Sequence, residues 1–273
     1  KIIGEIRVPT HFKDFIHPYT KPDNNKFRYL MDRLNDKLQQ KNLGAFYTPL
    51  PYVKKAHELL YQAIERVPVG NDYIILDRCA GTGNLLEGLS DEILSHYIVN
   101  TYEYYEYKVL LENYGDKIRY IIPPREDDTT FMDGLVRGSD ALSKEFIDNP
   151  VIQSYVDDPD CNVIIFENPP YTETTSIEHQ RTGNSKKSSG WKKSFVLQEM
   201  KKDVVGVARN DMANAFIWSA YEYYLKKPGD SLLVFSPIKY WKNQHLMDKE
   251  FLGGFLFNRR HFHTNTDAAI TCI

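Results

Sequence analysis

The sequence has few cysteines, no long apolar run and no excess of basic residues, and each of these absences excludes a class of protein. Three cysteines occur in 273 residues, at Cys79, Cys161 and Cys272, and no two of them have the spacing of a metal site. A small, odd number of cysteines argues against a disulfide framework and fits a reducing, cytoplasmic setting. We therefore expect neither disulfides nor a cysteine-based metal site.

No apolar stretch approaches the roughly 20 residues of a membrane-spanning helix, and no signal-peptide pattern is visible. The formal net charge is -3, whereas proteins that bind polyanions generally are strongly basic. We expect no membrane partner and no general affinity for polyanions, although a local basic patch remains compatible with this charge. The length suits one α/β domain with additions.

The motif Asn168-Pro169-Pro170-Tyr171 follows an apolar run, residues 163–166, that predicts a strand buried on both faces of a parallel sheet. Two consecutive prolines remove two backbone donors, so the strand must end in a stiff loop. The Asn168 side-chain oxygen and the Pro169 carbonyl are then fixed acceptors beside the Tyr171 ring. They suit a planar group that carries an NH2, and accepting both of its N–H groups would activate the nitrogen for attack.

Taken alone, this motif is better explained as a proline-capped strand end, so other segments must decide its meaning. Residues 73–77 predict a buried strand, which is followed by a turn with Gly81 and Gly83 and a helix from about Leu85. Leu86 replaces the third glycine of the dinucleotide fingerprint, and no phosphate-cradling lysine is present. Asp77 at the strand end suits a cofactor with a cationic amino-acid portion and no phosphates, such as S-adenosylmethionine.

Acidic residues follow the next two expected strands. Glu103 ends a strand near residues 97–102 and is placed to accept hydrogen bonds from ribose hydroxyls. Glu106 is a rival for this role, but we expect it to face water. Asp140 stands at the expected end of a third strand, where it would suit an adenine amino group; alone, such a residue is more often a turn or cap residue.

The flanking segments complete an alternation of strands and helices. Residues 23–44 predict an amphipathic helix, and a second helix begins near Pro51, before which Thr48 is either a cap or a functional residue. A basic loop, residues 172–193, either contacts nucleic-acid phosphates or is solvated. A helix over 210–224, a strand over 231–236 and a closing pair of strands, 253–257 and 268–273, are predicted after it. Because the last pattern stops within a strand, we expect the chain to be part of a longer protein.

Together, the segments 44–49, 77–86 and 168–171, with Glu103 and Asp140 between them, resemble the adenine-specific (N6) DNA amino-methyltransferases. The type I modification subunits and type IIG restriction enzymes have this order of motifs. The resemblance implies an α/β, Rossmann-like S-adenosylmethionine-dependent methyltransferase sheet with a reversed last strand. It implies a catalytic domain over residues 44–273, preceded by an N-terminal helical extension over 1–43 that serves as a connector.

The resemblance also implies a role for each matching residue. Those that would bind S-adenosylmethionine are Tyr47, Thr48 and Pro49 at its methionine end, Asp77, Ala80, Gly81 and Gly83 around its pocket, Glu103 at its ribose, and Asp140 and Ala141 at its adenine. Asn168 and Pro169 would bind the target amine, Pro170 would shape the turn, and Tyr171 would stack on the target base. That base would be flipped out of double-stranded DNA, because its amine cannot reach the methyl group from within the stack. No metal is implied.

The function that the resemblance implies is methyl transfer to the exocyclic amine of adenine in DNA, within a bacterial or archaeal restriction-modification system. No target-recognition region is visible after the last expected strand, so we expect separate or fused recognition and nuclease parts. Enzymes that methylate a glutamine amide of proteins also carry Asn-Pro-Pro-Tyr, and they are one alternative. A cofactor-dead DNA-binding or scaffold module is the other, although the intact Asp77, Gly81, Gly83, Asn168 and Tyr171 argue against it.

Overall fold

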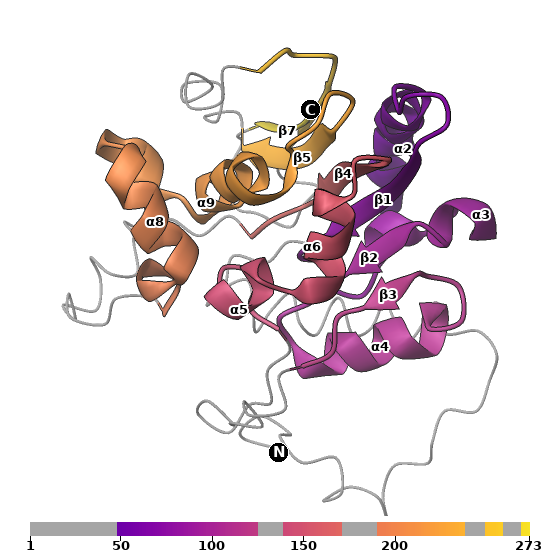
Figure 1. Ribbon diagram of the computed structural model, residues 1–273, viewed down its shortest axis with the longest axis horizontal. Coiled ribbons are helices and arrows are strands. Elements are labelled where there is room, and N and C mark those ends of the chain that lie inside the picture. Colours follow the sequence, from indigo (N-terminus) through magenta and orange to yellow (C-terminus); the bar gives the residue numbers. More distant parts are fainter. Residues whose placement is uncertain (1–47, 125–138, 171–189, 238–248, 259–268) are drawn as a thin grey trace, which may run out of the picture.

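A sheet of seven strands forms the centre of the protein (Figure 1). The computed structural model describes residues 48–124, 139–170, 190–237, 249–258 and 269–273, in which the strand order is β3-β2-β1-β4-β5-β7-β6. The strands are β1 Asp72–Asp77, β2 Tyr97–Val99, β3 Tyr120–Ile121, β4 Cys161–Glu167, β5 Ser231–Pro237, β6 Phe255–Asn258 and β7 Ala269–Cys272. Strands β1 to β5 pair in parallel, whereas β7 lies antiparallel between β5 and β6. The expected reversed last strand is therefore β7.

The two central strands, β1 and β4, are buried on both faces, as their apolar runs predict. Ile75 and Phe166 belong to the core on one face of the sheet, and Ile74 and Ile165 belong to the core on the other. Because successive side chains of a strand point to opposite faces, one apolar run supplies both cores. All four side chains are fully buried.

Helices cover both faces of the sheet (Figure 1). The face of Ile75 packs against α2 Leu50–Glu65, η2 Asn84–Leu86, α3 Asp91–Leu94 and α4 Tyr104–Tyr114. The face of Ile74 packs against α5 Lys144–Ile147, α6 Pro150–Asp157, α8 Phe195–Asp203, η4 Gly206–Asn210, α9 Met212–Ser219 and η5 Ala220–Tyr224, which is one π-helical turn. A further 3-10 turn, η3, spans Gly190–Lys193. The protein therefore has three layers.

Two predicted helices are confirmed. Helix α2 has Pro51 in its first turn and buries Val53, Ala56 and Leu60 completely, at the predicted helical spacing. Its N-cap is Pro49 and no side chain caps it, so Thr48 is not the helix cap. The helix predicted over 210–224 is present as α9 followed by η5.

Three sequence-based expectations about element ends are wrong. The third strand is the short β3, and residues 139–140 lie in no strand. Strand β2 ends at Val99, so Glu103 is instead the N-cap of α4. The helix expected from Leu85 is only the 3-10 turn η2, because the chain adopts a positive φ of 86° at Gly88 shortly afterwards. In contrast, the closing pair of strands is present as β6 and β7.

Several predictions lie outside the described residues: the amphipathic helix over 23–44, the extension over 1–43 and most of the basic loop over 172–193. Within the described part of the chain, no helix has the length and apolar character needed to span a membrane.

Candidate active site

The carboxyl ends of β1 and β4 bring three distant segments of the chain together. The Asn168 side-chain nitrogen, just after β4, donates a hydrogen bond of 2.7 Å to the Thr48 hydroxyl, just before α2. The Asn84 side chain, which follows the glycine turn after β1, donates to the Thr48 carbonyl at 3.4 Å. In parallel sheets, ligands bind at this edge, where the strand order reverses. Thr48 thus contacts both the segment after β1 and the segment after β4.

The hydrogen bond between Asn168 and Thr48 orients the Asn168 side-chain amide. Because the nitrogen of the amide points to Thr48, the oxygen of the same amide points in another direction. The backbone of Asn168 is also hydrogen-bonded to the Cys79 thiol, whose pKa is raised by burial. Pro169 is buried and Pro170 is half-buried, whereas Tyr171 and Tyr47 lie outside the described residues.

The glycine turn after β1 needs glycine for two reasons. Gly81 and Gly83 have φ values of +56° and +88°, which side chains of the L form rarely adopt. A Cβ atom on Gly83 would also lie 2.8 Å from the Tyr114 ring and 3.1 Å from the Leu110 side chain. The turn therefore packs directly on α4. Because η2 is a single turn, it has little macrodipole to attract a phosphate, in agreement with the phosphate-free cofactor expected here.

Asp77 has a carboxyl oxygen that lacks a partner. Its side chain is fully buried, and Oδ1 accepts a hydrogen bond of 3.0 Å from the Cys79 N–H. Oδ2 is buried without a hydrogen bond to any described residue. Burial raises the pKa of Asp77 well above its ordinary value. Buried polar atoms are normally paired, so this oxygen fits a ligand that presents a cation or an N–H group.

Asn100, which the sequence interpretation missed, holds the strand ends together. Its side-chain nitrogen donates to the carbonyls of Arg78 at 2.9 Å and Ser139 at 3.0 Å, and its Oδ1 is buried without a described partner. The Ala80 N–H donates to the Asn100 carbonyl at 2.8 Å. The one available signal was a polar residue directly after a buried apolar strand.

The acidic residues after β2 are both buried. Glu103 is 5% exposed and Glu106 is 6% exposed, so the expectation that Glu106 faces water is wrong. Glu106 accepts a short hydrogen bond from the Thr101 hydroxyl, which turns its carboxylate inward beside the end of β2. The site therefore contains two buried carboxylates where the sequence suggested one.

Asp140 and Ala141 lie beside the same edge, although they belong to no strand. The Ser139 N–H donates to the Thr101 carbonyl at 3.2 Å, which brings this segment next to the end of β2. The exposed Asp140 accepts a hydrogen bond of 2.9 Å from the Leu142 N–H, as a turn residue does, and Ala141 is buried. Both roles considered for Asp140 thus remain compatible with its position.

A buried ion pair, which the sequence interpretation also missed, joins the two loops. Arg78 follows Asp77 and Glu167 precedes Asn168, and both side chains have no exposed surface. The Arg78 guanidinium donates to both carboxylate oxygens of Glu167, from Nε at 2.9 Å and from Nη2 at 2.5 Å. The sequence carried no signal for this pair, because its members are 89 positions apart.

No protein-family model and no curated protein matches the sequence. Solved structures do. A type I restriction-modification methyltransferase subunit from Streptococcus thermophilus matches over 92% of this chain, with 15% identity and a TM-score of 0.51. The type IIG restriction endonuclease BpuSI matches over 91%, with 14% identity and a TM-score of 0.56. The fold is that of restriction-modification methyltransferase structures. The chain spans 48% of the first of these proteins and 27% of the second.

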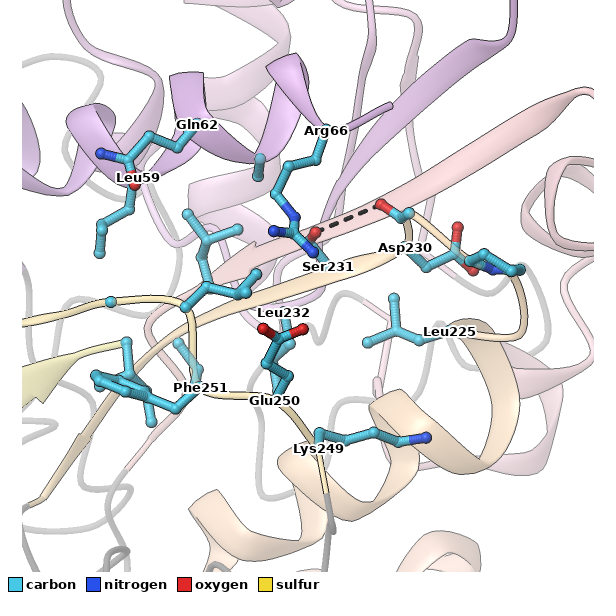
Figure 2. A pocket seen from close by; sticks show the side chains of 18 of the residues that line it. Leu59, Gln62, Arg66, Leu225, Asp230, Ser231, Leu232, Lys249, Glu250 and Phe251 are labelled. Carbon is cyan, nitrogen blue, oxygen red and sulfur yellow. Dashed lines mark hydrogen bonds between the residues drawn. The ribbon is translucent and has the colours of Figure 1, made fainter. Parts of the chain in front are cut away.

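The protein also has a cavity of about 690 Å³ whose lining differs from the candidate site (Figure 2). This cavity lies along β5, from Ser231 to Val234, between α2 and the segment before β6. Figure 2 shows the Arg66 and Glu250 side chains pointing into it from these two elements. Its lining includes none of Thr48, Asp77 and Asn168, so it is distinct from the candidate active site. Within the described residues, no cluster of His, Cys, Asp or Glu could hold a metal ion.

Proposed function

We propose that this chain transfers a methyl group from S-adenosylmethionine to the exocyclic amine of adenine in DNA, as the catalytic part of a restriction-modification enzyme. The observation that carries the proposal is the hydrogen bond between Asn168 and Thr48. It joins Thr48 to Asn168 at the carboxyl edge of the sheet, where parallel α/β sheets generally bind ligands. The methyltransferase fold shared with the neighbouring structures supports it.

On the cofactor side, the residues present fit S-adenosylmethionine. The unpartnered oxygen of Asp77 would accept from its ammonium group, and the backbone of Ala80, Gly81 and Gly83 would line its pocket. Glu103 would accept from the ribose hydroxyls. Asp140 and Ala141 would flank the adenine, and Tyr47, Thr48 and Pro49 would close the methionine end. When bound, the cofactor supplies a methyl group on a cationic sulfur.

On the acceptor side, Asn168 and Pro169 would bind the two N–H groups of the target amine. Two acceptors draw the nitrogen lone pair out of conjugation with the ring and stabilise the positive charge that develops on nitrogen. Thr48 would hold the Asn168 amide in the orientation that presents its oxygen. Pro170 would keep the loop rigid, and Tyr171 would stack on a base flipped out of the duplex.

Proton transfer needs no residue of its own in this mechanism. The methylated amine is strongly acidic while it carries a positive charge, so its proton can leave to water after transfer. Because the chain spans about half or less of the two neighbours, sequence recognition and nuclease activity would belong to other parts of a larger enzyme.

The test is methyl transfer from labelled S-adenosylmethionine to DNA, followed by digestion of the DNA to nucleosides. We expect label in N6-methyl-2′-deoxyadenosine, and no transfer by Asn168→Ala, whose cofactor affinity in calorimetry should remain within a few-fold of wild type. Asn210→Ala is the matched control, because Asn210 is an exposed asparagine at the end of η4 and belongs to none of the motifs. It should transfer normally.

Two results would redirect the assignment. Label found in glutamine after digestion of a protein acceptor, with none in DNA, would indicate a glutamine-amide methyltransferase. Absence of cofactor binding by a folded chain would indicate a DNA-binding or scaffold module. Normal turnover by Asn168→Ala would refute the proposed mechanism itself.

A further inference from the structure

The guanidinium of Arg78 is held on every side. Besides Glu167, it donates from Nη1 to the Ser219 hydroxyl at 2.7 Å and from Nη2 to the Phe216 carbonyl at 2.7 Å. Its central carbon lies 5.2 Å from the ring of Phe216, in α9, and 5.3 Å from the ring of Tyr224, the last residue of η5. The Arg78 side chain therefore cannot move without disturbing α9, η5 and the end of β4.

A buried ion pair of this kind generally adds little to the free energy of unfolding compared with apolar packing. Removing both charges from water is costly, and apolar side chains of similar volume often replace such pairs without loss of stability. What a bidentate pair provides better than apolar packing is a defined direction and distance between two backbones. The function of the pair should therefore depend on what its two ends are attached to.

The two ends are attached to the two halves of the proposed site. Arg78 is bonded to Asp77, whose Oδ2 is buried without a hydrogen bond to any described residue, and Glu167 is bonded to Asn168. Strands β1 and β4 pair directly, with Leu76 opposite Ile165, but this pairing ends before the two loops begin. Beyond the last strand pair, the side chains of Arg78 and Glu167 continue the connection.

We infer that Arg78 and Glu167 form a positioning pair, which sets the acceptor loop of Asn168 against the cofactor loop of Asp77. This inference rests on the proposed function. The reaction requires the attacking nitrogen to lie in line with the methyl group, so small displacements between the loops matter. A misplacement of about 1 Å can reduce a rate by about 100-fold. Neither residue touches a reacting atom.

The decisive variant is the double replacement Arg78→Met with Glu167→Leu, which removes both charges and keeps an apolar core. We expect it to fold with a stability close to wild type and to bind S-adenosylmethionine within about threefold. Its single-turnover rate of methyl transfer should fall by about 100-fold, as for a displaced reacting group. A folded double variant that transfers at the wild-type rate would overturn the inference.

Glu167→Gln provides a second test if the double variant does not fold. It keeps the side-chain volume but places an NH2 group against the guanidinium, so we expect a reduced rate with unchanged cofactor affinity. Equal losses of rate and cofactor affinity would indicate a merely structural role and would overturn the inference. The matched control is Arg119→Lys, because Arg119 forms a partly exposed ion pair with Asp72 at 3.1 Å, at the other end of β1.

A crystal structure of the double variant separates this inference from the proposed function. If the wild-type chain methylates neither DNA nor protein, the proposed function fails, and the position of Asn168 alone then decides the inference. Displacement of Asn168 from its 2.7 Å hydrogen bond with Thr48 would support the positioning role. An unchanged hydrogen bond would refute it.

Discussion

Replacement of Gly83 by alanine tests whether the glycine turn must pack directly on α4. An alanine at φ +88° costs about 1–2 kcal/mol, because its Cβ approaches the neighbouring carbonyl. The same Cβ would lie 2.8 Å from the Tyr114 ring, which is 8% exposed, and 3.1 Å from the fully buried Leu110. Overpacking of this kind costs about 1–3 kcal/mol. We therefore expect Gly83→Ala to lower the free energy of unfolding by about 2–5 kcal/mol.

Gly88→Ala separates the two contributions. Gly88 has nearly the same φ, +86°, but a Cβ there would meet nothing within 4 Å, so only the backbone cost of about 1–2 kcal/mol applies. Urea unfolding of both variants measures the difference. Gly83→Ala should also bind S-adenosylmethionine more weakly, because relief of the contact moves α4, whose N-cap is Glu103. Equal destabilisation by the two substitutions would refute the packing argument.

Three further predictions concern the polar residues of the site. Burial raises the pKa of Asp77 in the folded protein above its value in the unfolded chain. Below the unfolded pKa the carboxyl is protonated in both states and costs no stability, and as the pH rises from there toward the folded pKa the protein loses stability. Asp77→Asn should therefore be more stable than wild type at pH 8 but not at pH 3, and should bind S-adenosylmethionine more weakly; identical urea unfolding curves at pH 8 would contradict this. Glu103→Gln should weaken cofactor binding, measured by calorimetry, by about 1–3 kcal/mol. Glu106→Gln should weaken it less, because the Glu106 carboxylate accepts a hydrogen bond from Thr101. The reverse order would assign the ribose to Glu106. Thr48→Val removes the acceptor for the Asn168 amide, so the transfer rate should fall while folding, followed by circular dichroism, is retained; an unchanged rate would show that the hydrogen bond does not orient Asn168.

Much of the architecture could be predicted from the sequence, because its signals are local. The apolar runs of β1 and β4 are long enough to require burial on both faces, and the spacing of Val53, Ala56 and Leu60 repeats with the helical period. The glycines of the turn after β1 indicated backbone conformations that other residues avoid. Two prolines after β4 required the strand to end there.

Where local signals were weak, the predictions failed. Strand β3 has two residues and gives no clear pattern, so the third strand was expected near Asp140. Glu106 was expected to face water, because helical spacing alone does not show that Thr101 turns its carboxylate inward. Strand β3 is fixed by its pairing with β2, and the Glu106 carboxylate is fixed by a hydroxyl that lies before α4.

The sequence by itself determined the two central strands, the glycine turn, helix α2 and the proline-rich end of β4. Only the tertiary structure decided which of these residues meet. The Asn168–Thr48 hydrogen bond joins positions 120 apart, and the Arg78–Glu167 pair joins positions 89 apart. The physical reason is that periodicity and turn chemistry act over a few residues, whereas the partner of a buried polar group is set by how the sheet and its helices pack.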